Sequence, residues 1–144
     1  MSKTQNTDSY QITWLVRRLF RALGQKSGEY LEGFGISVAD RAVIEFLYPD
    51  HKLSVPEIAE RYKVSRQHIQ VTVNSLIELG LIKTETNPKH KRSQLILLNG
   101  KGRKLFEKIK AREKQEIDLL FKDIPASHCK QTRLTLETLL KRLS

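Results

Sequence analysis

The chain has one cysteine, Cys129, in 144 residues, which excludes an internal disulfide and a cysteine-based zinc cluster. No apolar stretch approaches the roughly 20 residues of a membrane-spanning helix. Arg17, Arg18 and Arg21 interrupt the N-terminal region where a signal peptide would be continuously apolar. We therefore expect a protein of the reducing cytoplasm, with Cys129 packed as a small hydrophobic residue rather than serving as a redox switch.

The histidines and glycines form no pattern that is typical of a catalytic site. His51, His68, His90 and His128 are scattered, and no two of them have the spacing of a helical metal site. The Gly33–Gly35 segment is too short for a phosphate-binding loop. We therefore expect no enzyme activity, no cofactor and no metal.

Acidic residues are few relative to basic ones. The 26 Lys and Arg against 16 Asp and Glu give a net charge of +10. An excess of this size favours a polyanionic partner such as nucleic acid, although a merely solvated basic surface is the alternative. The length predicts a single domain covering residues 1–144.

The first half of the chain predicts several helices. Apolar spacing predicts an amphipathic helix over Tyr10–Leu23 that ends before Gly24. Loosely structured chain should follow over Gly28–Gly35, with at most a short helix around Tyr30 and Leu31.

Two capping boxes then predict two helix starts. Ser37 with Asp40, and Ser54 with Glu57, each place a hydroxyl three residues before an acid. The first of these helices should end before Pro49, and the second should end near residue 63.

A third helix and a hairpin follow. Ser65 is a suitable N-cap, and Gly80 can end the helix in a left-handed conformation. Residues 82–86 and 94–98 are strand-like. This order predicts a mainly α protein with a small β-wing, in which a winged helix-turn-helix lobe covers about residues 36–98.

The third helix has the composition of a DNA-recognition helix. Its projection predicts an inward side made of Ile69, Val73, Leu76, Ile77 and Gly80. Gln and Asn can pair with adenine, and valine can contact a thymine methyl, whereas a merely solvated helix would favour Glu and Lys. The residues expected to contact DNA are Ser65, Arg66, Gln67, His68, Gln70, Val71, Asn74 and Ser75.

The loop between the two strands is basic. It contains Lys89, His90, Lys91 and Arg92. Such a run is usually a solvated turn, but its place directly after a recognition helix favours contact with the DNA backbone or the minor groove.

The terminal helices carry apolar stripes. Asn99 can cap a helix that runs to about residue 122, and a further helix follows Pro125 as far as Leu143. One chain of this length has no obvious way to cover these stripes, so we expect dimerisation helices at about 10–33 and 99–144. Packing of the terminal helices on each other within one chain is the alternative. The residues expected at the dimer interface are Ile12, Leu15, Leu19, Leu136, Leu139, Leu140 and Leu143.

The run from Leu53 to Leu105 resembles the MarR family of transcriptional regulators. The segment NPKHKRSQLILLNGKGRKL is similar to the family's wing and following helix start, with Arg92 as the wing arginine and Gly102 as the glycine of that helix start. Leu76, Gly80 and Leu81 match the end of the recognition helix, and Asn99 stands where the family usually has a capping threonine.

Two positions depart from the family's pattern. His90 stands where an aspartate usually braces the wing arginine, and Val71 stands where relatives often have arginine. These departures affect how the protein would recognise DNA bases and how rigid the wing is expected to be, but they do not affect the expected fold.

The resemblance implies a homodimeric, sequence-specific regulator of transcription, with repression as the expected outcome, on a pseudo-palindromic double-stranded DNA site. It also implies a small-molecule effector bound between the dimer helices and the DNA-binding lobe. Trp14, Tyr30 and Tyr48 are candidates for that pocket, although core packing is the preferred interpretation of each. A non-specific architectural or replication-accessory DNA binder is the alternative function, and a protein-interaction module without a DNA role is a third.

Overall fold

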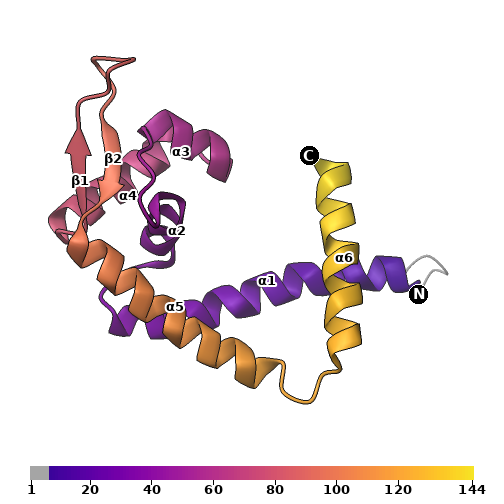
Figure 1. Cartoon of the computed structure of the whole chain (residues 1–144). Helices are drawn as coiled ribbons and strands as arrows, with labels where there is room; N and C mark the ends of the chain where they lie inside the picture. The colour runs from indigo at the N-terminus through magenta and orange to yellow at the C-terminus, as the bar shows by residue number, and fades with distance from the viewer. Residues whose placement is uncertain (1–6) are drawn as a thin grey trace. The chain divides into compact units, whose positions relative to one another are not determined.

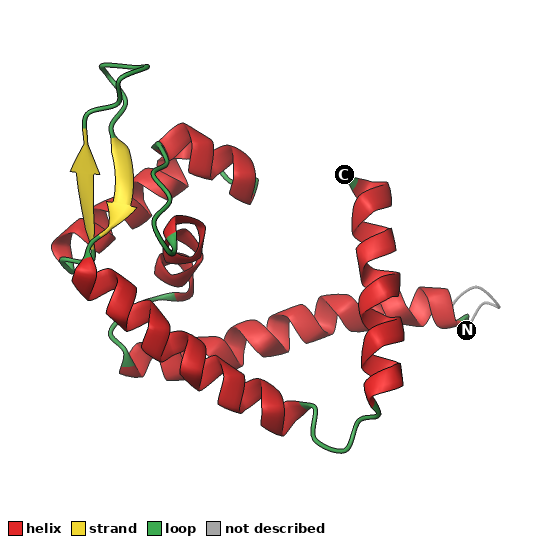
Figure 2. Cartoon of the chain, viewed as in Figure 1, coloured by secondary structure: helices red, strands yellow, loops and turns green. Residues whose placement is uncertain are grey.

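The computed structural model describes residues 7–144 (Figures 1 and 2). Its contacts cluster into two compact units, one ending at Ile109 and the other spanning Lys110–Ser144. The prediction of a single domain therefore stays a prediction. The helices are α1 (Asp8–Gly33), α2 (Val38–Leu47), α3 (Val55–Tyr62), α4 (Arg66–Glu78), α5 (Gly100–Leu120) and α6 (Ala126–Leu143), and the strands are β1 (Ile82–Glu85) and β2 (Leu95–Leu98).

Helix α1 is longer than the sequence pattern predicts. It continues through Gly24 and Gly28 instead of ending before them, so the predicted loose segment is wrong. Leu31 is fully buried, and Tyr30 packs against the same core. Burial of such side chains contributes more than the roughly 1 kcal/mol that each glycine costs a helix, which explains the extension.

Both predicted capping boxes are confirmed. Asp40 N donates to Ser37 Oγ at 3.0 Å, and Ser37 N donates to Asp40 Oδ2 at 3.0 Å. At the start of α3, Ser54 N donates to Glu57 Oε1 at 3.2 Å, and Glu57 N donates to Ser54 Oγ at 3.4 Å. Each box satisfies backbone donors that the first turn of a helix leaves free, so the starts of α2 and α3 are fixed locally.

The turn between α3 and α4 takes a left-handed residue without using glycine. Lys63 has φ of 60°, and Val64 N donates to Ala59 O at 3.1 Å. Ala59 is buried, where its small side chain lets α3 and α4 approach closely. Ser65 then caps α4 by accepting from His68 N at 3.0 Å, as its sequence position predicts.

The wing is an antiparallel hairpin. β1 pairs with β2 in the register Ile82–Leu98 to Glu85–Leu95, and Leu53 adds an isolated bridge to Ile96. Lys52 Nζ also lies 2.9 Å from Glu85 Oε2. The segment before α3 is thereby joined to both strands of the wing.

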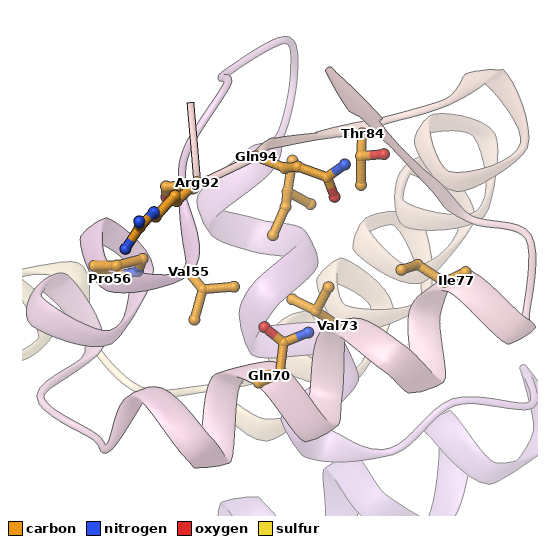
Figure 3. A pocket seen from close by; sticks show the side chains of 10 residues that line it. Val55, Pro56, Gln70, Val73, Ile77, Thr84, Arg92 and Gln94 are labelled. Carbon is orange, nitrogen blue, oxygen red and sulfur yellow. The ribbon is translucent and has the colours of Figure 1, made fainter. Parts of the chain in front are cut away.

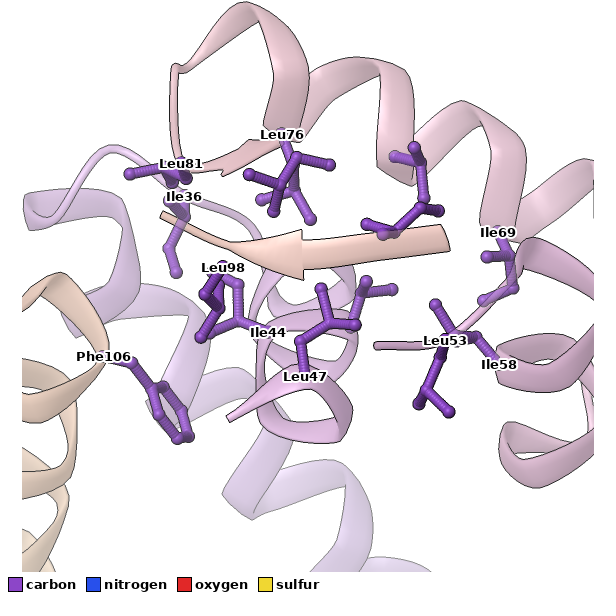
Figure 4. Packing of buried hydrophobic residues seen from close by; sticks show 14 of the residues in the cluster. Ile36, Ile44, Leu47, Leu53, Ile58, Ile69, Leu76, Leu81, Leu98 and Phe106 are labelled. Atoms are coloured by element: carbon purple, nitrogen blue, oxygen red, sulfur yellow. The ribbon is translucent and has the colours of Figure 1, made fainter. Parts of the chain in front are cut away.

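One hydrophobic core holds the first unit together. Side chains from α2, α3, α4 and β2 point toward one another, together with Phe106 of α5 (Figure 4). The prediction that Ile77 faces inward is wrong, because this side chain is 48 % exposed. Thr72 is buried in its place, and its hydroxyl is satisfied by donating to His68 O at 3.1 Å.

The start of α5 is attached to the turn that follows α4. Gly102 N donates to Asn99 Oδ1 at 2.9 Å, which confirms Asn99 as the N-cap. The same side chain donates through Nδ2 to Gly80 O at 2.7 Å, and Gly80 has φ of 70°. Asn99 therefore holds the turn after α4 to the start of α5.

The second unit contains the end of α5 and all of α6. Its surface carries ion pairs at i,i+4 spacing, such as Lys114 with Asp118 at 2.7 Å and Arg133 with Glu137 at 2.6 Å. α6 has no buried residue, and Leu140 and Leu143 are 67 % and 86 % exposed. These leucines leave apolar surface exposed on α6.

Candidate nucleic-acid interface

The outer face of α4 is polar, exposed and almost free of acid. Among the eight residues predicted to contact DNA, Ser75 is half-buried and the other seven are exposed. Val71 is 63 % exposed in the middle of this face. An isolated apolar side chain among amides is suited to contact with a thymine methyl, provided that the helix enters a major groove.

The N-terminal end of α4 is open to an anion. Ser65, Arg66 and His68 surround the first turn, and all three are exposed. The backbone N–H groups and the positive end of the helix dipole there favour a phosphate. Arg66 supplies a full positive charge at the same place.

Two amides on this face are hydrogen-bonded to each other. Gln70 Nε2 donates to Asn74 Oδ1 at 2.9 Å. The two residues are one turn apart, which is the spacing at which helix side chains meet. The sequence predicted each of them as a separate DNA contact and did not foresee their pairing.

The wing loop is shaped by its own polar groups. Lys89 N donates to Asn87 Oδ1 at 3.0 Å, and Ser93 N donates to His90 O at 3.1 Å. The four predicted contact residues, Lys89, His90, Lys91 and Arg92, are all exposed. The loop therefore presents a concentrated positive charge at the tip of the hairpin.

The positive charge of the wing acts on one nearby carboxylate, that of Glu57. The pKa of Glu57 is lowered, first because its carboxylate accepts the backbone N–H of Ser54 and then because it accepts the Ser54 hydroxyl. The positive charges of Arg61 and Lys89 lower it further. Glu57 therefore stays ionised beside the wing.

A cavity of about 400 Å³ separates α4 from the wing (Figure 3). Gln70 and Val73 line it from α4, Val55 and Pro56 from the start of α3, and Arg92 from the wing. In Figure 3 the Arg92 side chain extends toward Pro56. Helix α4 and the wing arginine thus border one hollow.

Several further residues around this hollow were not predicted from the sequence. Thr84, Ser93 and Gln94 line it from the wing, and Ile77 lines it from α4. No local pattern marks them, because the hollow exists only where three distant segments meet.

A second cavity, of about 650 Å³, lies where α1 ends and α5 begins. Phe34, Ile36 and Leu81 give it apolar walls, and Lys101 and Lys104 are among the basic residues that line it. It is thus a mixed apolar and basic hollow on the same unit as α4.

The three aromatic residues considered for an effector pocket line neither of these cavities. Tyr48 makes an edge-on ring contact with Phe106 at 5.0 Å, and Tyr30 packs against the core. Trp14 is exposed, with the Arg18 guanidinium 4.6 Å from its ring centre. For Tyr30 and Tyr48, the preferred interpretation of core packing holds.

Residues 7–144 contain neither a metal-binding cluster nor a membrane-spanning helix. No group of three His, Cys, Asp or Glu side chains in that range could hold a metal ion. Within the same range, no helix combines the length and apolarity needed to cross a bilayer. Cys129 is a free thiol that is only half-buried, so it is more accessible than the expected packed position.

The residues predicted at a dimer interface lie on α1 and α6. Ile12, Leu15 and Leu19 are exposed on α1, and Phe20 beside them is 79 % exposed. On α6, Leu140 and Leu143 are exposed, whereas Leu136 and Leu139 are half-buried. α1 and α6 therefore each present apolar surface within their own unit.

Comparison with known proteins identifies the family. Residues 34–93 match the model of the MarR family. The chain is also 32 % identical to an uncharacterized protein of Mycobacterium tuberculosis over 106 residues, which are 72 % of this chain and 74 % of that protein. This chain belongs to the MarR family. A protein of Mycobacterium bovis matches this MarR chain to the same extent.

Several solved structures share the fold over nearly the whole chain. A crystal structure of a MarR family transcription regulator covers 99 % of this chain and 97 % of its own, with a TM-score of 0.85 and 24 % identity. BldR from Sulfolobus solfataricus has a TM-score of 0.83 and 18 % identity, with 99 % of both chains covered. MepR of S. aureus, solved as a complex with DNA, has a TM-score of 0.80 and 21 % identity, covering 92 % of this chain and 98 % of its own. The winged-helix fold predicted from the sequence is confirmed.

Proposed function

We propose that this MarR-family protein is a sequence-specific regulator of transcription that binds double-stranded DNA, with repression by promoter occupancy as its mode of action. One observation carries the proposal: the exposed amide-rich face of α4 lies on the same compact unit as a basic wing tip. The crystal structure of MepR, which has a similar fold and was solved in a complex with DNA, supports the proposal.

The two parts of this surface have different tasks. The outer face of α4 offers hydrogen bonds and a methyl contact to base edges in a major groove, through Gln67, Gln70, Val71 and Asn74. The strength of these contacts depends on the DNA sequence. The first turn of α4 and the wing offer positive charge to phosphates, which strengthens binding without reading bases. Arg92 in the wing is suited either to a phosphate or to a narrow minor groove.

A homodimer is part of the proposal. Exposed apolar residues on α1 and α6 would be covered by a second copy of the chain, and a large apolar interface of this kind is typical of an obligate dimer. Two-fold symmetry would place two recognition helices in successive major grooves, about 34 Å apart, on a pseudo-palindromic site. Light scattering on the intact chain measures the mass directly. A monomeric mass at micromolar concentration would contradict the dimer.

A small-molecule effector completes the proposal. A ligand that changes the separation of two recognition helices would weaken binding, because both helices must match the spacing of the grooves. Such regulation takes place where the DNA is, so we assign the protein to the cytoplasm.

The alternative is a non-specific architectural or replication-accessory DNA binder. The net charge of +10 and the wing favour DNA affinity of either kind. Only the α4 face separates the two functions. If Gln67→Ala weakens binding to a preferred site by 10-fold or more and leaves random DNA unaffected, the helix reads sequence, whereas equal losses on both DNAs favour the alternative.

The deciding experiment is selection from a random duplex pool with the purified protein at near-physiological salt. An enriched inverted repeat is expected, and A·T pairs in the half-sites would match the amide-rich face. Retention of DNA without an enriched motif would support the architectural alternative. No retention, even when the selection is repeated at low salt, would exclude DNA binding and favour a protein-interaction module.

A further inference from the structure

The hydrogen bond between Gln70 and Asn74 joins two amides that would otherwise move independently. Both side chains are exposed, and the Nε2 to Oδ1 distance is 2.9 Å. At 100° per residue the two positions are about 40° apart around α4, with Asn74 nearer the centre of the outer face. Gln70 lies toward the cavity beside the wing. Its bond to Asn74 therefore turns a side chain from the flank of the helix toward the outer face.

The bond also fixes which atoms the pair presents. Asn74 Oδ1 is directed at Gln70, so its two N–H groups are turned away from Gln70 and are free to donate. Gln70 keeps its Oε1 and one N–H for other partners. Both side chains are held before any DNA arrives, so less conformational freedom is lost on binding.

We propose that Gln70 and Asn74 read DNA as one unit that is directed at a single base pair, with the N7 of a purine accepting from an amide of the pair. Purine N7 lies in the major groove and accepts hydrogen bonds in both adenine and guanine. The inference rests on the proposed function, because it requires a preferred DNA site. It makes Gln70 and Asn74 specificity-determining residues that depend on each other.

Gln67 provides a matched control on the same helix. Gln67 is exposed, as Gln70 is, but it lies nearer the centre of the outer face, and its side chain makes no hydrogen bond within residues 7–144. It is seven residues from Asn74, whereas Gln70 is four residues away. Gln67 and Asn74 should therefore act independently.

The test is a pair of double-mutant cycles on the selected DNA site. Affinities are measured for the wild type, Gln70→Ala, Asn74→Ala and the double variant, and again with Gln67→Ala in place of Gln70→Ala. If each single change in the bonded pair weakens binding about 10-fold, independence predicts about 100-fold for the double variant, and coupling predicts only slightly more than 10-fold. In the Gln67 cycle, the fold losses of affinity of the two single variants should multiply in the double variant. Thermal unfolding of each variant shows whether α4 remains folded.

A base-pair scan supplies the second readout, which a merely structural role would not change. Gln70→Ala and Asn74→Ala should relax base preference at the same position of the site. Replacing the purine there by its 7-deaza analogue should weaken the wild type and leave Asn74→Ala nearly unaffected. Three results would each overturn the inference. The affinity losses of Gln70→Ala and Asn74→Ala could multiply in the double variant, or the two variants could relax base preference at different positions. The wild type and Asn74→Ala could also be equally sensitive to the 7-deaza base.

The design keeps the inference separate from the function on which it rests. If the wild type prefers no site, the proposed function fails, and the inference that requires such a site fails with it. If the wild type selects a site and the bonded pair behaves like the Gln67 control, regulation by sequence-specific binding stands and the paired unit is refuted.

Discussion

Replacing Gly102 by alanine should destabilise the first unit by removing the space that lets α5 begin against the end of α4. Gly102 is buried in the first turn of α5. A Cβ built there would overlap the carbonyl oxygen of Leu81 at less than 3.0 Å, and it would lie 3.1 Å from Leu98 Cδ2. The carbonyl is backbone, so relief requires α5 or the segment after α4 to shift.

The expected cost follows from two opposed effects. Overpacking of a well-packed site costs typically about 1–3 kcal/mol. The better helix propensity of alanine returns at most about 1 kcal/mol. Gly102→Ala should therefore lower the free energy of unfolding by about 1–2 kcal/mol when both principles are combined.

Gly100 is the matched control for this change. It lies in the same helical turn, and an added Cβ would meet nothing within 4 Å. Gly100→Ala should thus be neutral or stabilising by up to about 1 kcal/mol. Urea unfolding followed by circular dichroism, at one protein concentration for all variants, gives the comparison. Equal stability of the wild type and Gly102→Ala would refute the argument that the start of α5 depends on this close approach.

Further predictions concern the cap, the acid response and the wing. Asn99→Ala should lower the free energy of unfolding by about 0.5–2 kcal/mol, because it removes the acceptor for Gly102 N, whereas Asn99→Asp keeps that acceptor and should lose less in the same urea assay. The pKa of Glu57 is lowered by its hydrogen bonds to Ser54. Its carboxylate therefore stabilises the fold fully at pH values above 4.5, the ordinary pKa of the group, and this stabilisation is lost as the pH falls through the lowered pKa. The stability gap between wild type and Glu57→Gln should therefore narrow on acidification below pH 4.5, and a gap that does not change between neutral and acid pH would contradict this. Arg92→Ala should weaken preferred and random DNA alike and reduce the slope of log affinity against log salt by about one unit, and an unchanged slope would exclude a phosphate contact.

The sequence by itself determined the elements whose signals are local. The capping boxes at Ser37 and Ser54, the cap at Ser65 and the left-handed Gly80 each act through neighbouring residues, so they were predicted in the correct places. The exposed polar face of α4 followed from periodicity for the same reason. The winged-helix order is the sum of these local signals.

The tertiary structure decided what depends on residues far apart in the chain. α1 continues through Gly24 and Gly28 because Leu31 is buried in the core, which no local propensity reveals. Ile77 is exposed and Thr72 buried because the wing leaves a hollow beside one flank of α4, which shifts the buried face around the helix. Gly102 and Asn99 matter because α5 starts against the residues that end α4, and a contact between segments about 20 residues apart is set by packing rather than by local sequence.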